Sequence, residues 1–129
     1  MRNSSFELAE RLRKRQFERM VRKAIHSLPP DIHAMMVNVE IVIEDEPSDE
    51  LRGDDEDGPF GLYEGIPLTE RTSWYGLVLP DKITIFRGPL ERATDTPSEL
   101  FAEVRATVIH EVAHFFGMDE AQVAELGYE

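Results

Sequence analysis

Residues 96–117 constrain the fold most, because they carry a helix start, a helix body and a helix stop in one run. Thr96-Pro97-Ser98-Glu99 offers a capping hydroxyl, a proline at the first helical position and a carboxylate at the third. The helix should run to about Phe116, since Gly117 is a natural left-handed stop. Five apolar residues at helical spacing predict a face that packs on a core: Phe101, Val104, Val108, Val112 and Phe115.

Two histidines occupy another face of this predicted helix. His110 and His114 are four residues apart, so they project about 40° from each other and roughly 120° from the apolar stripe. Two imidazoles directed the same way can bind one divalent cation, whereas the plain alternative is a histidine pair on a solvated face. The chain has no cysteine, so a transition-metal site must use histidine and carboxylate. In a His-Glu-x-x-His motif, Glu111 is the expected general base and not a ligand.

The remaining segments predict a single α+β domain over residues 1–129, with a small, mostly antiparallel sheet packed on an N-terminal helix and on the histidine-bearing helix. In chain order we expect a helix over 4–28 ended by Pro29-Pro30, a strand over 37–43, a solvated acidic loop over 44–59, short strands over 60–63 and 77–79, a clearer strand over 82–87, and a last short helix over 119–126.

Carboxylates dominate the charge of the chain. Its 26 Asp and Glu residues against 14 Lys and Arg give a formal net charge of -12, which would repel a phosphate backbone, so we expect no nucleic-acid partner. No run is apolar and long enough for a bilayer span or a secretory core, so we expect no membrane partner and a cytoplasmic location.

The first predicted helix departs from this acidic character. Its basic residues are Arg11, Arg13, Lys14, Arg15, Arg19, Arg22 and Lys23. They could pair with the acidic loop of a second copy, which makes a homodimer possible; a simply solvated helix face is the alternative. His26 and His33 lie near the end of this helix, where surface or core roles fit them better than metal binding.

The motif His110-Glu111-Val112-Ala113-His114, followed by Gly117 and two carboxylates, resembles the extended zincin signature. In that signature the helix ends at glycine and the third ligand comes three residues later, as histidine in metzincins and aspartate in aspzincins. The chain as a whole resembles a family of small bacterial zincin-like metallopeptidases of about this length. The shared features run from residues 61–65 through residues 81–90 to Gly127-Tyr128, and only the metal motif is specific in itself.

The resemblance implies a minimal zincin-like fold with Zn²⁺ bound by His110, His114 and Glu120, and with Glu111 as general base. Glutamate stands at position 120 where the aspzincin pattern has aspartate, and Asp119 directly precedes it. Glu120 is favoured as the ligand because Asp119 is also suited to cap the last helix. Imidazole and carboxylate accept several divalent ions, so the sequence does not select zinc.

These residues together predict hydrolysis of a peptide or amide bond in a peptide or protein substrate, with a metal-activated water as nucleophile. An extended substrate could add to a sheet edge formed by residues 60–63 or 77–79. Tyr128 could support the ligands or donate its hydroxyl to a developing oxyanion, and an ordinary half-buried terminal tyrosine is the alternative. The rival function is a catalytically inactive domain of the same fold that binds metal or another protein.

Overall fold

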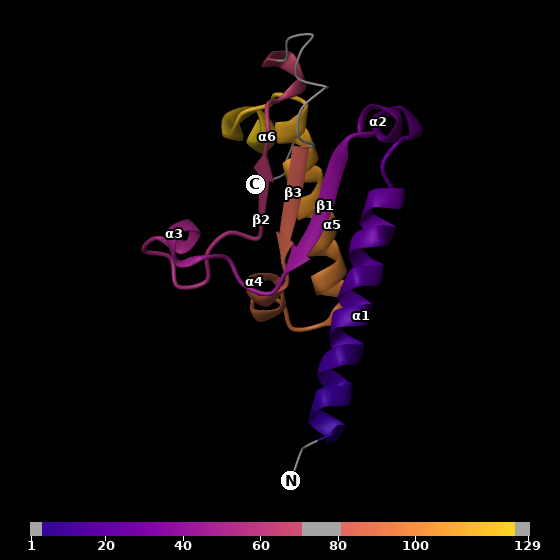
Figure 1. Cartoon of the computed structure of the whole chain (residues 1–129), viewed down its shortest axis with the longest axis vertical. Coiled ribbons are helices and arrows are strands. Elements are labelled where there is room, and N and C mark those ends of the chain that lie inside the picture. Colours follow the sequence, from indigo (N-terminus) through magenta and orange to yellow (C-terminus); the bar gives the residue numbers. More distant parts are fainter. Residues whose placement is uncertain (1–3, 71–80, 126–129) are drawn as a thin grey trace.

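The computed structural model describes residues 4–70 and 81–125, and it confirms the α+β class (Figure 1). Its elements in chain order are α1 (Ser4–His26), α2 (Pro30–Met35), β1 (Val39–Glu44), α3 (Asp49–Arg52), β2 (Gly61–Glu64), the 3-10 helix η1 (Leu68–Glu70), β3 (Asp81–Phe86), α4 (Arg87–Arg92), α5 (Pro97–Phe115) and α6 (Glu120–Glu125). Helix α5 matches the strongest expectation from the sequence to within one residue. The acidic segment expected as a loop contains the short helix α3, which the Ser48 side chain caps.

The described sheet has the strand order β1-β3-β2 and is mixed, whereas the sequence predicts a mostly antiparallel sheet. β3 pairs parallel with β1 and antiparallel with β2. Alternating apolar residues reveal which face of a strand is buried, but they carry no information about strand direction. β3 follows β1 and β2 in the sequence but lies between them in the sheet. The expected strand over 77–79 lies outside the described residues.

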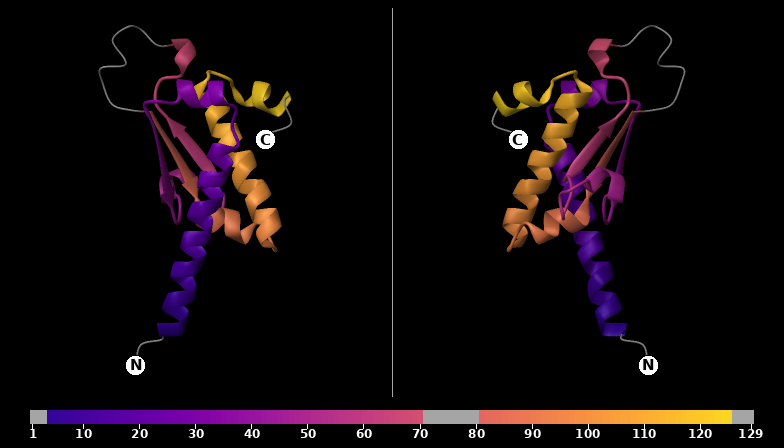
Figure 2. Two further views of the ribbon diagram at one scale, coloured as in Figure 1. Left: turned by 90° about the vertical axis from the view of Figure 1, so that its right-hand side faces the viewer. Right: turned by 90° about the vertical axis from the view of Figure 1, so that its left-hand side faces the viewer.

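Helices α1 and α5 cover one face of the sheet (Figure 2). The core lies in this interface, and α5 contributes the side chains that its apolar stripe predicted, with Phe101 at the margin. The buried apolar residues of the cluster are Phe17, Val21, Ala24, Leu28, Ile83, Ile85, Leu90, Val104, Val108 and Val112. Packing on both α1 and the sheet fixes the rotation of α5, and with it the direction of its remaining faces.

Helix α1 extends beyond the body of the domain at its N-terminal end (Figure 1). Its first buried residue is Phe17, whereas Leu8 and Leu12 are 51% and 54% exposed. Pro29 and Pro30 separate α1 from α2, but Pro30 also begins α2, because proline fits the first helical position. None of the described helices combines the length and the apolar composition that a bilayer span requires.

Arg87 joins three elements through a buried guanidinium. The sequence places it at the end of a strand, but β3 stops at Phe86 and Arg87 opens α4. Its side chain is 8% exposed and donates to Asp45 (3.0 Å), Glu10 (2.9 Å) and Glu91 (3.0 Å). These bonds connect the C-terminal end of β1 to α1 and α4. A planar group with five N–H donors can serve three carboxylates at once.

We expect Arg87→Ala to lower the free energy of unfolding by about 2–3 kcal/mol, because it leaves three carboxylates close together without their cation. Arg92→Ala is the matched control: Arg92 also binds two carboxylates, but its side chain is 46% exposed, so the loss should stay below about 1 kcal/mol. Urea unfolding followed by circular dichroism measures both. Equal losses would contradict a special role for the buried guanidinium.

The same cluster predicts a pH dependence of stability. The hydrogen bond from Arg87 lowers the pKa of Glu10, and Arg87 also outweighs partial burial to lower the pKa of Asp45. Because these folded-state pKa values lie below the unfolded ones, their stabilisation is complete above the ordinary carboxyl pKa and is lost as pH falls through the folded values. Stability should therefore depend less steeply on pH between about 5 and 3 in Arg87→Ala than in the wild type.

Candidate metal centre

Both ends of α5 are fixed by local interactions that the sequence encodes. At the start, the Thr96 hydroxyl accepts a hydrogen bond from the Glu99 N–H (3.1 Å). At the end, Gly117 adopts φ +92°, and the N–H groups of Gly117 and Met118 bond to the carbonyls of His114 and Ala113. This is a Schellman motif, which turns the chain back at once after the last helical turn. Residues 118–120 therefore return toward the histidine face of α5.

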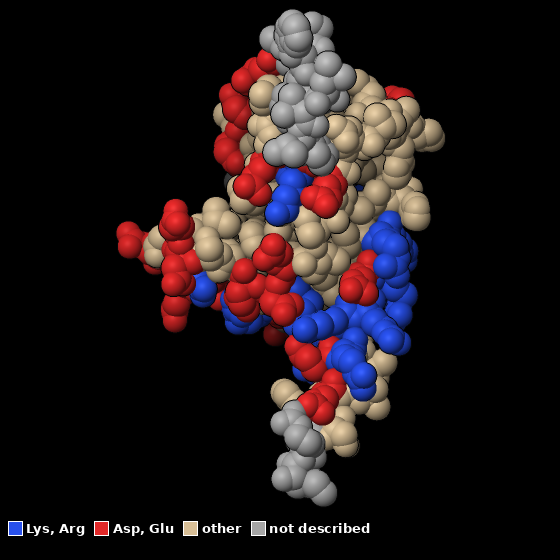
Figure 3. Space-filling view, viewed as in Figure 1, with Lys and Arg blue, Asp and Glu red and all other residues tan. Residues whose placement is uncertain are grey.

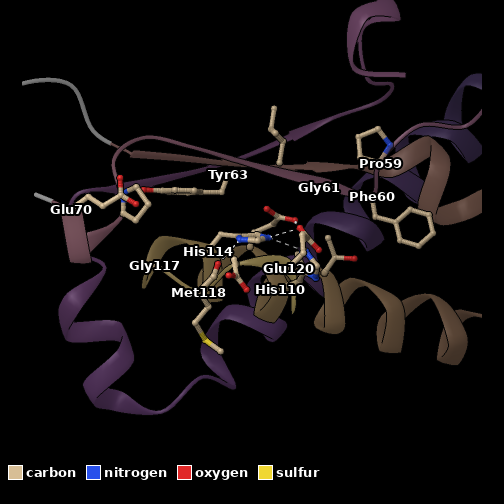
Figure 4. Close-up of a pocket in the computed structure, with 15 residues that line it drawn as sticks. Pro59, Phe60, Gly61, Tyr63, Glu70, His110, His114, Gly117, Met118 and Glu120 are labelled. Carbon is tan, nitrogen blue, oxygen red and sulfur yellow. Dashed lines mark hydrogen bonds and ion pairs between the residues drawn. The ribbon is translucent and has the colours of Figure 1, made fainter. Parts of the chain in front are cut away.

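Three possible ligand atoms meet at this return (Figure 4). His110 Nε2 and His114 Nε2 are 3.1 Å apart, and Glu120 Oε1 lies 3.2 Å from the first and 2.8 Å from the second. Among the described residues, this is the group of histidine and acidic side chains whose geometry could hold a metal ion. The two predicted imidazoles and the favoured carboxylate are thus brought together; their role as ligands stays a prediction.

Asp119 and Glu120 have separate roles in the structure. The Asp119 carboxylate accepts a hydrogen bond from the Gln122 N–H (2.9 Å), and the Gln122 side chain accepts one from the Asp119 N–H (2.8 Å). This reciprocal pair caps the start of α6 and engages the Asp119 carboxylate away from the histidines. Partial burial opposes the charge of Glu120, but hydrogen bonds with His110 and His114 outweigh it and lower the pKa of its carboxyl.

The tautomer of His114 is set by its surroundings. Its Nδ1 lies 2.8 Å from the Met118 carbonyl oxygen, which can only accept, so Nδ1 carries the hydrogen. In the neutral imidazole the lone pair is then on Nε2, which points to the shared centre. A backbone carbonyl behind a ligating histidine is a common support of metal sites. His110 differs, because its Nδ1 is buried and has no hydrogen-bond partner among the described residues.

The cluster fits a tetrahedral zinc ion. Zinc binds imidazole nitrogen and carboxylate oxygen at about 2.0–2.1 Å, so neighbouring ligand atoms in a tetrahedron lie about 3.3–3.4 Å apart. The observed separations of 2.8, 3.2 and 3.1 Å need only a small outward adjustment. Glu120 is the first residue of α6 and its side chain is 74% accessible, so this adjustment requires no repacking of the core.

Glu111 lies at the boundary between the histidine face and the core face of α5. Its carboxylate is 3.9 Å from His110 Nε2 and only 7% of the residue is exposed. Burial raises the pKa of Glu111, while the neighbouring His110 and His114 and a hydrogen bond from the Tyr63 backbone N–H partly offset the rise. The Glu111 carboxylate therefore lies close to the candidate metal position but is not one of the three clustered ligand atoms. This is the position that a group accepting a proton from a metal-bound water requires.

A cavity of about 560 Å³ opens over this cluster (Figure 4). Strand β2 and the two residues before it form one wall, η1 and Pro67 another, and the turn into α6 a third. Among its lining residues are Phe60, Tyr63, Glu70, Met118 and both histidines. The Tyr63 hydroxyl donates to Asp81 (2.6 Å), so this tyrosine is held as part of the wall and its hydroxyl already has an acceptor.

Two glycines permit close approach around the cavity. A Cβ at Gly61 would lie 2.8 Å from Thr107 Cγ2 and 3.1 Å from Glu111 Cγ, so β2 rests directly on α5 beside the proposed base. A Cβ at Gly117 would overlap the Thr69 side chain of η1. Gly117 was expected as a helix stop only, and Gly61 had no predicted role. Neither close approach is visible in the sequence, because each depends on a segment distant along the chain.

The described histidines outside the motif do not join the cluster. Tyr128 lies outside the described residues, so its expected supporting role remains a prediction. His26 and His33 face each other with ring centroids 6.2 Å apart, away from the metal candidates. The contributions that sequence reasoning missed are the Tyr63 backbone N–H and the Met118 carbonyl, which are main-chain groups and leave no signature in residue type.

A mixed sheet packed on a helix that carries His-Glu-x-x-His, with a carboxylate brought to the two histidines after a glycine turn, defines a zincin-type domain. Comparison with protein families agrees: residues 36–128 match the zincin-like metallopeptidase family, and the chain belongs to it. A conserved hypothetical protein of known structure from T. thermophilus shares the fold, with 21% identity and a TM-score of 0.54 over 78% of this chain and 91% of that one. No curated protein sequence matches.

The purified protein should contain close to one equivalent of zinc, measured by mass spectrometry of metals after dialysis. We expect His110→Ala and His114→Ala to lose it and Glu120→Ala to bind at least about tenfold more weakly. His33→Ala and Asp119→Asn are matched controls that should keep full occupancy, since one removes an unrelated imidazole and the other retains a capping side chain. Undiminished zinc in all three cluster variants would exclude the assignment.

Gly61→Ala tests how closely β2 must lie on α5. The added methyl group should push the strand away from Thr107 and Glu111 and lower the free energy of unfolding by about 1–3 kcal/mol. Thr107→Ser removes the nearest methyl but keeps the hydroxyl that donates to the Glu103 carbonyl (2.8 Å). The double variant should therefore recover part of the loss in urea unfolding. Simple addition of the two single losses would contradict this contact.

Proposed function

We propose that this chain is a zinc-dependent peptidase, with His110, His114 and Glu120 as ligands and Glu111 as general base. The observation that supports this most is the meeting of three ligand atoms within 3.2 Å of one another beside a buried carboxylate that is not one of them. A purely structural zinc site is closed by four protein ligands. Among the described residues, this cluster supplies three and faces a cavity.

Zinc bound by these residues would lower the pKa of a water molecule and polarise the scissile carbonyl. Glu111 lies within reach of the same space and accepts one proton of the attacking water at its carboxylate while the water oxygen bonds to the carbonyl carbon. It then donates that proton to the leaving amine as the C–N bond breaks. The backbone N–H of Tyr63 and the packing of Gly61 hold Glu111 in place for both transfers.

Strand β2 suggests how a peptide would be presented. In the described sheet it pairs only with β3, and Gly61, Leu62 and Tyr63 line the cavity. An extended substrate can add to such an edge through main-chain hydrogen bonds, which places a peptide bond over the histidine face of α5. Phe60 and Met118 offer apolar contacts to substrate side chains at the cavity wall. A peptide or protein is therefore the proposed substrate.

We expect the wild-type protein to cleave unstructured casein or members of a peptide library, and we expect Glu111→Gln to reduce the rate by at least about a hundredfold while retaining zinc. The amide keeps the size of the side chain but cannot accept the proton. Mass spectrometry of the products measures cleavage, and the zinc content of the same samples controls for loss of the site.

The rival function predicts a different pair of results. A domain that binds metal or another protein without catalysis would contain zinc in both forms and cleave nothing in either. Wild type and Glu111→Gln with equal, residual hydrolysis at full zinc occupancy would therefore overturn the peptidase proposal. Loss of zinc in Glu111→Gln would instead show that the carboxylate belongs to the ligand set.

A further inference from the structure

We propose that two copies of the chain form a symmetric dimer in which the outer face of each α1 docks into an acidic groove on the sheet of the other copy. The proposal is independent of catalysis. It rests on two surfaces of the described chain that lie on different elements, carry opposite charges and both contain apolar residues.

The first surface is the outer face of α1. At 100° per residue, Leu8, Leu12 and the four arginines 11, 15, 19 and 22 fall within about 100° of one another and opposite the stripe that holds Phe17 and Ala24. Leu8 and Leu12 are half exposed, and none of these arginines forms an ion pair with a described residue. Figure 3 shows the basic side chains gathered along α1.

Leu8 and Leu12 on this face are left half exposed in the described structure. Residues 4–16 are exposed except for Glu10, and Glu10 and Lys14 reach the body of the domain only through ion pairs with Arg87 and Asp45, so more than three helical turns bury no apolar side chain. A helix of that length is only marginally stable alone in water, and most helix stability comes from packing an apolar face. Leu8 and Leu12, one helical turn apart, therefore leave apolar surface that a neighbouring chain can cover. The projecting end of the helix leaves room for that neighbour to approach.

The second surface is a groove of about 450 Å³ on the face of the sheet that α1 and α5 leave uncovered. Leu62, Phe86 and Leu51 supply its apolar lining, and Glu44, Glu46, Glu50 and Glu64 surround them. Lys82 is the one cation among the described lining residues, and strand register sets it between Glu40 and Glu64. Acidic side chains gather over α3 and this part of the sheet in Figure 3.

The two surfaces complement each other. Leucine side chains of α1 can enter over Leu62 while the arginines meet the surrounding carboxylates, and Glu44, Glu50 and Glu64 have no ion-pair partner among the described residues. A net charge of -12 opposes binding of a nucleic acid or an anionic membrane by the whole chain. A second copy brings the matching groove itself, and reciprocal insertion closes as a two-fold dimer and does not extend into a filament.

Two charge-reversed variants test this arrangement by light scattering coupled to size exclusion. Variant A carries Arg15→Glu and Arg19→Glu, and variant B carries Glu44→Arg and Glu50→Arg. We expect the wild type to show twice the 14.8 kDa mass of one chain, and A and B to be monomers separately. An equal mixture of A and B should recover the doubled mass, because the acidic helix of A then meets the basic groove of B, and the basic helix of B the acidic groove of A.

A matched control separates this effect from net charge. Asp54→Arg with Glu56→Arg changes the charge by the same amount as variant B, but these residues follow α3 and lie outside the groove, so this variant should remain a dimer. Raising the salt from about 50 mM to about 500 mM should weaken the wild-type dimer at least tenfold. The proposal would be overturned if the wild type were monomeric at every protein concentration tested, or if the mixture of A and B stayed monomeric. Binding of monomeric wild type to anionic vesicles or to DNA through Arg15 and Arg19 would also overturn it.

Discussion

The candidate site depends on the packing of one helix. Val104, Val108 and Val112 of α5 are buried against α1 and the sheet, and this contact fixes the rotation of the helix about its axis. Once that rotation is set, helical geometry alone directs His110 and His114 into the cavity and puts Glu111 at its edge. The chemistry of the histidines and the stability of the fold are thus carried by different faces of the same element, so each can vary without directly altering the other.

Strand β2 contributes to the site through its backbone more than through its side chains. It reaches α5 at Gly61, where no side chain separates the two elements, and Tyr63 supplies both the N–H that bonds to Glu111 and a ring whose hydroxyl is anchored on Asp81. The edge proposed to receive a peptide is therefore the same segment that holds the proposed general base. In this arrangement a bound peptide would contact the same strand that positions Glu111.

Local signals explain which features could be predicted from the sequence. Helix α5, its two faces, the stop at Gly117 and the capping function of Asp119 all follow from residues within a few positions of one another. The parallel pairing of β1 with β3, the buried Arg87 and the short helix α4 depend on contacts between distant segments. Arg87 resembles a surface residue at a strand end because nothing near it in sequence indicates Glu10 or Asp45. The main-chain contacts to Glu111 and His114 could not be predicted because backbone groups leave no signature in residue type.

The Schellman turn after α5 has a consequence for how the centre forms. Because it reverses the chain within three residues, the proposed ligands all come from eleven consecutive positions, His110 to Glu120. Closing so short a loop has a small entropic cost, and it requires no long-range strand pairing. A refolding chain that has formed only α5 and its turn already holds the full donor set. Binding of the ion could thus precede docking of the sheet. The bound cation would then stabilise the C-terminal end of α5 and the turn that follows it.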